Sequence, residues 1–383
     1  MTEPRIYQDI RIQADSLAGV LQHQCGEGLP AMLEAAALLR SKRRIVITGI
    51  GASMFASVPL EYALCEKGVD ATLIEAAELL HYRQPAYRDA LWIIVSRSGE
   101  SIEIKRLLES ATDRQTIIGI TNEPDSQLAR QAHVALLIGS LPDEMVAIQT
   151  YTGTLLTLHI LNRLIDATQE TVSAEIKHAL PGFAAHIHRE LESQHNWDSF
   201  LTPQHPMALL ARGPAMGSAL EGALLFNEIA KFPAFAAPIA SFRHGPIEVA
   251  DANFRAVVLA SSDRTRDLNI ALSEELARFG AMVRVVGPSD NNPAPSNWHR
   301  TPDVPKGLAP LFDIVPLQAA ATRLAELKGI WPGSFRYTPQ VAVDEALFTA
   351  PPGGSQRPQG QAPTLARENG FGEAANTSAK RKE

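Results

Sequence analysis

Cysteine is nearly absent from this sequence. Its 383 residues include only Cys25 and Cys65, which lie in different segments and show no metal-ligand spacing. Such scarcity excludes a disulfide scaffold and a zinc ribbon, and it is typical of proteins of the reducing cytoplasm. The chain is long enough to bury a sizeable core without either device.

Long hydrophobic runs are absent as well. No stretch reaches 18 uncharged apolar residues, and the first ten residues, MTEPRIYQDI, lack the apolar core of a secretory signal. We therefore expect a cytoplasmic protein that is not secreted and does not contact a membrane.

The sequence also lacks an excess of positive charge. The sequence has 35 basic and 42 acidic residues, which gives a net charge of −7. Non-specific binding to nucleic acid requires clustered positive charge, so no nucleic-acid partner is expected. A small anionic substrate remains compatible with this charge, because a few well-placed hydrogen-bond donors are enough to bind it.

What the sequence does contain is a repeated alternation of short apolar runs and helix-like stretches. The runs are bounded by glycine or polar residues, and they predict buried parallel strands at 45–49, 91–95, 116–120, 134–138, 207–211, 256–260 and 282–286. Strands that alternate with helices indicate an α/β fold in which helices cover both faces of a mostly parallel sheet. The later strands repeat the pattern of the earlier ones, so we predict two similar lobes.

The predicted organisation has four parts. They are a helical segment at 1–29, two α/β domains at 30–170 and 190–347, and a tail at 350–383. Nine of the 34 tail residues are proline or glycine, and Leu365 and Phe371 are its only large aliphatic or aromatic residues. Such a segment cannot bury enough apolar surface to offset its chain entropy, so we expect it to be disordered.

The first of two candidate anion-binding loops follows the strand predicted at 45–49. This loop, Gly49-Ile50-Gly51-Ala52-Ser53-Met54, lacks the third glycine of a dinucleotide fingerprint and the Gly-Lys-Ser/Thr of Walker A. Its backbone N–H groups and the Ser53 hydroxyl stand at a helix N-terminus, which is a natural site for an anion. The alternative is a tight turn in which Ser53 caps the helix.

The second loop, Val95-Ser96-Arg97-Ser98-Gly99-Glu100-Ser101, is richer in donors. Three hydroxyl groups, an arginine and a glycine surround one predicted helix start, and a phosphate monoester requires such a density of donors. The alternative is a serine-capped helix with a solvated arginine. We favour the phosphate site, because the carboxyl ends of adjacent strands in an open α/β sheet share one crevice.

The second lobe carries two candidate catalytic residues, Glu228 and His244. Glu221 and Glu228 lie on a helix predicted at 216–232 that is apolar almost all round. Burial among apolar side chains is expected to raise the pKa of Glu228, which suits proton transfer near neutrality. His244 lies in the loop Phe242-Arg243-His244-Gly245-Pro246, whose shape exposes a side chain. A glutamate and a loop histidine near a phosphate pocket are the usual equipment of an aldose–ketose proton shuttle.

In order and spacing, these motifs resemble the double sugar-isomerase (SIS) domain family. The resemblance runs from about residue 30 to 347 and includes Ala211-Arg212-Gly213 and Glu221-Gly222-Ala223-Leu224. It implies two tandem flavodoxin-like SIS domains and a homodimer with a shared active site. It also implies that Glu228 moves the sugar proton and that His244 assists ring opening across the dimer interface. The implied sugar-phosphate-binding residues are Gly51, Ser53, Ser96, Arg97, Ser98, Gly99, Ser101 and Val146.

Departures from the family pattern narrow the predicted chemistry. The isomerase half of glucosamine-6-phosphate synthase has a helix lysine where this chain has Leu225, and its Schiff-base lysine falls on or near Gln340. Without those lysines, covalent imine chemistry lacks its obvious nucleophile. The stretch from His244 to Asp251 is more similar to that of fructosamine-6-phosphate deglycases, whose substrate already carries its amine on C1. The sequence has neither the glutaminase domain nor the initial cysteine of the synthase, so no glutaminase activity is expected.

Two classes of function follow from this resemblance. The first is an enzyme: a fructosamine-6-phosphate deglycase or, alternatively, an amino-sugar-phosphate deaminase or an aldose–ketose isomerase, in each case without a metal or another cofactor. The second is a catalytically silent sugar-phosphate sensor, since SIS domains also occur in regulators. The sequence has no recognisable DNA-binding helix-turn-helix and retains Glu228 and His244, which favours the enzyme.

Overall fold

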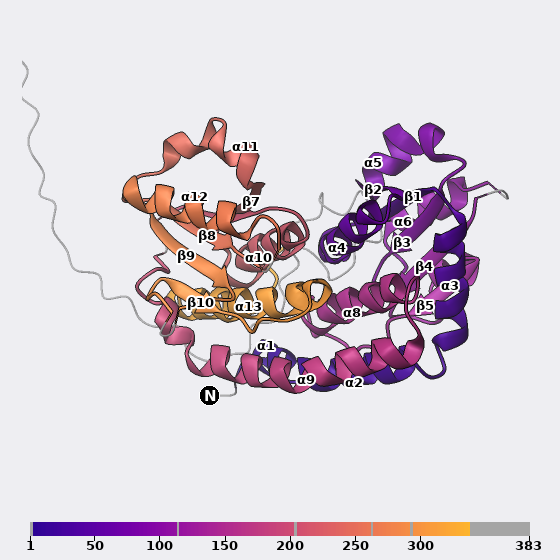
Figure 1. Cartoon of the computed structure of the whole chain (residues 1–383), viewed down its shortest axis with the longest axis horizontal. Helices are drawn as coiled ribbons and strands as arrows, with labels where there is room; N and C mark the ends of the chain where they lie inside the picture. Colours follow the sequence, from indigo (N-terminus) through magenta and orange to yellow (C-terminus); the bar gives the residue numbers. More distant parts are fainter. Residues whose placement is uncertain (1–2, 113–114, 203–204, 262, 292–293, 338–383) are drawn as a thin grey trace, which may run out of the picture. The chain divides into compact units, whose positions relative to one another are not determined.

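The computed structural model describes residues 3–112, 115–202, 205–261, 263–291 and 294–337. Gln340 and the tail predicted at 350–383 lie outside these ranges. Within the described part, the chain forms two parallel five-stranded sheets flanked by helices (Figure 1), which confirms the predicted α/β fold class.

The first sheet has the order β2-β1-β3-β4-β5, and every pair of neighbouring strands is parallel. Its strands are β1 (Arg44–Gly49), β2 (Asp70–Glu75), β3 (Leu91–Val95), β4 (Ile117–Thr121) and β5 (Val134–Leu137). Alternate side chains of β3 point to opposite faces: Leu91 and Ile93 enter the main core, whereas Trp92 and Ile94 enter a separate cluster. Both faces are therefore buried, which explains why the strand is apolar throughout.

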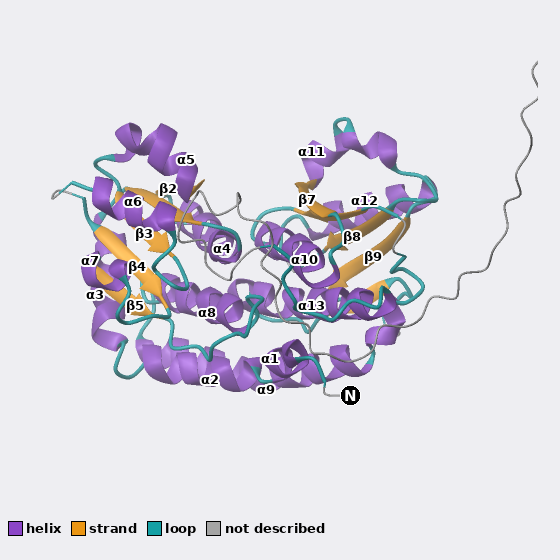
Figure 2. Cartoon of the chain, turned by 180° about the vertical axis from the view of Figure 1, so that it is seen from behind, coloured by secondary structure: helices purple, strands orange, loops and turns teal. Residues whose placement is uncertain are grey.

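Helices connect the strands of this sheet and cover it (Figure 2). The helices between the strands are α4 (Ala52–Glu66), α5 (Ala76–Glu78), α6 (Ile102–Ser110) and α7 (Gln127–Gln131). The chain begins with α1 (Arg5–Arg11) and α2 (Gln13–Gln24), which lie in the predicted helical segment 1–29, and α3 (Leu29–Ser41) leads from there to β1. After β5 the chain continues into α8 (Gln149–Arg163) and α9 (Gln169–Glu192), which lead to the second lobe.

The second sheet has the order β10-β9-β8-β6-β7, again with parallel neighbours. Its strands are β6 (Met207–Ala211), β7 (Ala234–Pro238), β8 (Arg255–Leu259), β9 (Met282–Gly287) and β10 (Trp298–Arg300). Its helices are α10 (Ala215–Ala230), α11 (Ile239–Arg243), α12 (Arg266–Arg278) and α13 (Ala309–Leu327). Counted from the first strand of each lobe, the two sheets have the same strand order, so the predicted repeat is a repeat of topology.

Three strands escaped the prediction from sequence, namely β2, β7 and β10. All three lie at the edges of their sheets. β2 carries an acidic residue at each end, β7 is rich in alanine and ends at a proline, and β10 has only 3 residues, so none of them shows the pattern by which the other strands were recognised.

Helix α4 of the first lobe packs closely against α10 of the second. A Cβ atom placed on Gly217 would lie 2.5 Å from the carbonyl oxygen of Phe55, so the absence of a side chain permits this approach. The loop before α4 reaches the same helix, since a Cβ on Gly51 would lie 3.9 Å from Leu224 Cδ2. The close packing places the strand ends of the first lobe beside the face of α10 that carries Glu228.

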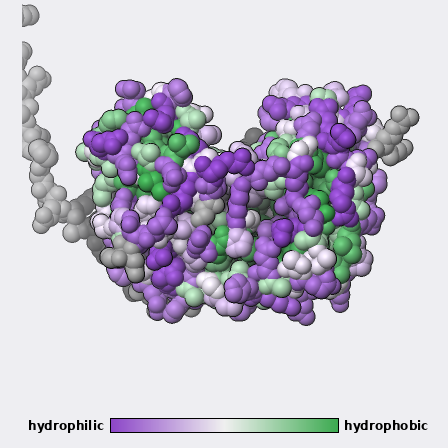
Figure 3. All heavy atoms as spheres, viewed as in Figure 1, coloured by the Kyte–Doolittle hydropathy of each residue, from purple (hydrophilic) through white to green (hydrophobic). Residues whose placement is uncertain are grey.

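The surface is polar on the face shown in Figure 3, where hydrophobic side chains appear in small groups among hydrophilic ones. None of the helices in the described ranges combines the length and the apolar character that a membrane crossing requires.

Candidate active site

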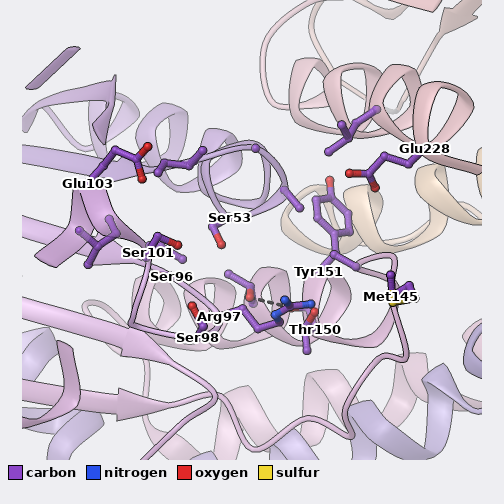
Figure 4. A pocket seen from close by; sticks show the side chains of 18 of the residues that line it. Ser53, Ser96, Arg97, Ser98, Ser101, Glu103, Met145, Thr150, Tyr151 and Glu228 are labelled. Carbon is purple, nitrogen blue, oxygen red and sulfur yellow. Dashed lines mark hydrogen bonds between the residues drawn. The ribbon is translucent and has the colours of Figure 1, made fainter. Parts of the chain in front are cut away.

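A pocket of about 300 Å³ opens where the loops after β1 and β3 face α10 (Figure 4). These two strands are neighbours at the point where the strand order of the first sheet reverses, which is where open α/β sheets bind ligands. The pocket brings together most of the predicted site residues: Gly51, Ser53, Ser96, Arg97, Ser98, Ser101 and Glu228. In Figure 4 the serine side chains lie on one side of it and Glu228 lies on the other.

The loop after β1 places Ser53 in the first turn of α4. The residue at the N-cap position is Gly51, which has φ 52° and ψ −130° and no side chain with which to cap the helix. The alternative interpretation of Ser53 as the helix cap is therefore wrong, and its side chain lines the pocket instead. The N–H groups of a first helical turn have no partner within the helix, so they can bind an anion there.

The loop after β3 is folded on its own hydrogen bonds. The Gly99 N–H donates to the carbonyl oxygen and to Oγ of Ser96, each at 3.1 Å, and the Glu100 N–H donates to Ser98 Oγ at 3.3 Å. The Glu100 carboxylate pairs with Lys105 at 2.6 Å and accepts the Gln127 N–H at 2.6 Å. These contacts hold the Glu100 side chain away from the pocket, which it does not line.

Ser101 begins α6 but does not cap it with its side chain. It occupies the N-cap position without a side-chain cap hydrogen bond, and it lines the pocket. Arg97 is half-buried in the same pocket. The alternative of a serine-capped helix with a solvated arginine is therefore wrong for both residues, and the geometry supports an anion site.

Gly99 does not line the pocket, in contrast to the prediction from the resemblance. It has φ 61°, and a Cβ on it would lie 2.4 Å from Ser126 Oγ. Glycine is required at this position because the backbone is left-handed and the neighbouring chain is too close for a side chain. Its contribution is to shape the loop that presents the serines.

Positive charge in the pocket comes from Arg97. Burial lowers the pKa of this guanidinium, and the negative charges of Asp143, Glu123 and Glu228 oppose that effect. An arginine stays charged under these conditions. The pocket therefore contains one cation and several hydroxyl groups on the side opposite Glu228.

Glu228 lies on α10 and faces this cation across the pocket. Burial raises its pKa to about 7, while the positive charges of Lys231 and Arg97 oppose the increase. This increase in the pKa of Glu228 has the direction that was expected from its position on an apolar helix. A carboxyl with a pKa near 7 can both accept and return a proton at neutral pH, as a general acid–base residue must.

Glu221, two helical turns earlier, has a different environment. It is 1% exposed, and neither carboxylate oxygen has a hydrogen-bond partner among the described residues. Burial raises its pKa well above the usual value, and the negative charges of Glu228 and Asp143 raise it further. Glu221 does not line the pocket, which leaves Glu228 as the candidate base on α10.

Two predicted site residues lie outside the pocket. His244 is exposed in the turn that follows α11, beside Arg212, Ala240 and Arg243 in a separate hollow. Val146 has its side chain in the core, at 3% exposure, while its neighbours Met145 and Ala147 line the pocket. A single chain therefore does not bring His244 to Glu228. The role of His244 across a dimer interface and the backbone contact of Val146 stay predictions.

Further residues that the sequence did not suggest complete the pocket. They are Glu103, Met145, Ala147, Thr150, Tyr151, Thr154 and Phe335, together with several apolar residues of the two loops and of the adjoining strand and helices. Thr150, Tyr151 and Thr154 recur at helical spacing on α8, and this spacing is a signal that could have been used. No local pattern distinguishes Phe335, which reaches the pocket from the segment after α13. The described residues include no group of three or more His, Cys, Asp or Glu side chains that could hold a metal ion.

Known proteins with similar sequences process sugar phosphates. The chain is 28% identical over 304 residues to the glutamine–fructose-6-phosphate aminotransferase (isomerizing) of Pyrococcus horikoshii, covering 77% of this chain and 51% of that protein. It is 26% identical over 307 residues to the isomerizing aminotransferase 1 of Arabidopsis thaliana, covering 76% of this chain and 45% of that protein. The chain thus spans about half the length of these curated relatives.

Solved structures show the same fold at lower identity. The C-terminal domain of glucosamine-fructose-6-phosphate aminotransferase from Francisella tularensis superposes with a TM-score of 0.73 at 21% identity, covering 86% of this chain and 97% of that one. The tagatose-6-phosphate ketose/aldose isomerase of Escherichia coli superposes with a TM-score of 0.70 at 20% identity, covering 85% and 93%. The SIS domain model matches twice, at residues 38–162 and 200–327, once in each lobe. The chain belongs to the SIS domain family.

Proposed function

We propose that this chain is an enzyme that cleaves a phosphorylated fructosamine into an aldose 6-phosphate and an amine. The observation that carries the proposal is the position of Glu228, whose pKa is raised to about 7, across one pocket from a loop of serines and an arginine. The names of the relatives given above describe enzymes that act on fructose 6-phosphate, which supports a sugar phosphate as the substrate of this chain.

The phosphate of the substrate is bound by the loop after β3 and the first turn of α4. Ser96, Ser98 and Ser101 offer hydroxyl donors there, and Arg97 supplies the positive charge. Hydrogen bonds from such groups to a phosphate are charge-assisted and therefore strong. The sugar then extends from this loop toward α10.

Glu228 performs the proton transfer in the proposed reaction. Its carboxylate removes a proton from C1, next to the C2 carbonyl, and leaves an enaminol. Return of a proton to C2 gives an imine between C1 and the amine nitrogen. Water adds to this imine, and the C1–N bond breaks with proton transfer from a general acid, His244 or protonated Glu228. The products are one amine and one aldose 6-phosphate for each fructosamine phosphate and water consumed.

The residues around Glu228 favour this chemistry over one that needs an enzyme imine. Leu225, where the synthase relatives have a lysine, is fully buried and offers no amine. A fructosamine brings its own amine on C1, so no lysine nucleophile is required. Gln340, the second position of interest, lies outside the described residues.

We further propose that two copies of the chain form a homodimer in which His244 reaches the pocket of the other copy. His244 is exposed and lies in a hollow separate from Glu228 within one chain. An exposed loop histidine with no role in its own pocket is well placed for a shared site.

A substrate screen followed by mass spectrometry tests the proposed function. The full chain is incubated with fructosamine 6-phosphates of several amino acids, with fructose 6-phosphate and with glucosamine 6-phosphate; unphosphorylated fructosamines serve as the matched control. We expect equal amounts of amine and aldose 6-phosphate from the first group, and no release from the control.

The other outcomes of the screen select the alternatives. Interconversion of fructose 6-phosphate with an aldose phosphate alone identifies an isomerase, and ammonia from glucosamine 6-phosphate alone identifies a deaminase. Binding of a sugar phosphate without turnover of any compound identifies a sensor and contradicts the proposed activity.

A further inference from the structure

Helix α10 ends in a backbone conformation that a lysine rarely adopts. Lys231 follows its last residue with φ 50° and ψ 46°, and it is the one non-glycine residue of the described chain with positive φ. The Phe232 N–H donates to the carbonyl oxygen of Phe226 at 3.1 Å. This hydrogen bond is typical of a helix C-terminus in which the left-handed residue, here Lys231, is usually glycine. A side chain at this position costs about 1 kcal/mol relative to glycine. Such strain is typically kept where the side chain has a function.

The Lys231 side chain joins α10 to the segment that closes the pocket. Its Nζ donates to the carbonyl oxygens of Glu228 and Ser334. The same ammonium lies 5.6 Å from the ring centre of Phe335, within the range of a cation–π contact. Phe335 and Glu228 both line the pocket, so one lysine contacts the residue that carries the base and a neighbouring segment of the pocket wall.

The charge of Lys231 also acts on the Glu228 carboxyl. Lys231 is first and Arg97 second among the charges that oppose the increase in the pKa of Glu228 by burial. Burial and Arg336 lower the pKa of Lys231, and Glu228 raises it, so the two groups influence each other. The other titratable groups are Glu221 on α10, Tyr151 on α8 beside the same pocket, and Glu103 on α6 at the far side of the pocket (Figure 4). Of all these groups, Lys231 and Arg97 supply the positive charge toward Glu228.

We infer that Lys231 is a positioning residue for Glu228: its ammonium group ties the Ser334–Phe335 wall to the last turn of α10 and supplies positive charge that the ionised base needs. The expected effect of Lys231 on catalysis rests on the proposed function. Its electrostatic consequence concerns the protein alone and can be measured without a substrate.

Two substitutions at Lys231 separate charge from backbone. Lys231→Gly removes the ammonium and relieves the left-handed backbone, so we expect a melting temperature close to that of the wild type. Lys231→Arg keeps the charge. Lys328→Met is the matched control, because Lys328 Nζ donates to the Lys231 carbonyl oxygen at 3.0 Å and lies 5.5 Å from the Phe232 ring centre but does not line the pocket.

The direct readout is the titration of the Glu228 carboxyl by ¹³C NMR, in protein labelled at the glutamate side-chain carboxyl carbon. The Glu228 signal is assigned by its loss in Glu228→Gln. We expect its midpoint to move to higher pH in Lys231→Gly and to stay near the wild-type value in Lys231→Arg and Lys328→Met. An unchanged midpoint in Lys231→Gly, or an equal change in Lys328→Met, would overturn the inference.

Kinetics on a phosphorylated fructosamine provide the second readout. In Lys231→Gly, kcat/KM at pH 6 should fall by about three- to tenfold, as expected when an opposite charge near a base is removed, and it should recover toward the wild-type value at pH 8.5. A loss of equal size at both pH values would indicate a merely structural role and contradict the inference. If the wild-type chain turns over no fructosamine phosphate, the proposed function fails, while the NMR titration still decides on Lys231.

Discussion

In the proposed function, the Ser98 and Ser101 hydroxyls are the side chains that bind the substrate phosphate most directly. Both line the pocket, and Ser101 makes no side-chain cap bond to α6. Replacing both by alanine removes two charge-assisted donors and should raise KM for a phosphorylated substrate by about tenfold or more. Steady-state kinetics and a thermal melt measure this.

The control for the serine substitutions is Ser110→Ala at the other end of α6. The Ser110 hydroxyl donates to the Leu107 carbonyl oxygen at 2.8 Å, away from the pocket. The Ser110→Ala substitution should leave KM unchanged. An unchanged KM in the folded double variant would remove the assignment of the phosphate site.

A second residue-scale prediction concerns a buried carboxyl outside the pocket. Asp313 on α13 is 1% exposed and accepts the Ser261 hydroxyl at 2.5 Å. Burial raises its pKa to about 7 from a usual value of 3.8, so the folded state holds this proton more tightly than the unfolded state. Stability is therefore greatest below the unfolded pKa and is lost as the pH rises through about 7.

Asp313→Asn should consequently stabilise the fold at high pH. The amide keeps an acceptor for Ser261 but cannot ionise, so the gain in melting temperature should be clear at pH 8.5 and small at pH 5. Thermal melts of both proteins at the two pH values measure it. Equal changes at pH 5 and pH 8.5 would contradict a buried, titrating carboxyl.

At the scale of elements, the loop between β3 and α6 depends on Gly99. Gly99→Ala meets both a positive φ and the nearby Ser126 side chain, whereas Gly68→Ala meets a φ of 77° with nothing within 4 Å. We expect Gly68→Ala to cost about 1 kcal/mol of folding free energy and Gly99→Ala to cost more, roughly 2–4 kcal/mol. Gly99→Ala should also raise KM, because the serines move with the loop.

Chemical denaturation of the two glycine variants decides this prediction. If Gly99→Ala costs no more than Gly68→Ala, close packing against Ser126 is not what requires glycine at position 99.

Completely buried elements are the easiest to predict from the sequence. β3 is apolar at every position, β4 is buried at every position, and the helix that carries Glu228 is recognised by its composition. The hydrogen-bond donors of the two loops could be identified because each loop directly follows a strand. The carboxyl ends of neighbouring parallel strands lie at the same edge of the sheet, so loops that follow them lie close together.

The rest of the site depends on tertiary contacts. Tyr151 and Phe335 reach the pocket from α8 and from the segment after α13, far along the chain from the phosphate loops. Lys231 acquires its role only because α10 ends beside Ser334. No local pattern encodes these tertiary contacts, so the sequence identified the two loops and Glu228, which line the pocket, but not Tyr151 and Phe335.

At the scale of the whole molecule, the two lobes share a strand order but not a site. In the first lobe the crevice beside β1 and β3 is lined by hydroxyl groups and Arg97. In the second lobe the corresponding loops after β6 and β8 meet α13, where Ser261 donates to the buried Asp313. The described residues that line the small hollow there include two carboxylic acids, Asp263 and Asp313, and one cation, Lys306. The pocket beside β1 and β3 is therefore formed by loops of the first lobe together with Glu228, which lies on α10 of the second lobe.

A shared site between two copies makes a prediction for mixed dimers. Glu228→Gln and His244→Ala should each be nearly inactive. In a mixed dimer, one of the two sites receives Glu228 from one chain and His244 from the other and is intact, so an equilibrated equimolar mixture should regain about a quarter of the wild-type activity. Assays before and after subunit exchange measure this. If activity does not return although mixed dimers form, His244 does not act across the interface.

The most direct test of the proposed function is the turnover number of Glu228→Gln on a phosphorylated fructosamine. Glutamine keeps the shape of the side chain but cannot accept a proton from carbon. We predict a fall in kcat of about 10²–10⁴-fold, the usual contribution of a positioned general base. The melting temperature should be unchanged or higher at pH 8, because a partly buried charge is removed. In the wild type, kcat/KM should rise with pH through about 7, where Glu228 loses its proton, and this acidic limb should be missing from any residual activity. Near-full turnover by Glu228→Gln would contradict the account.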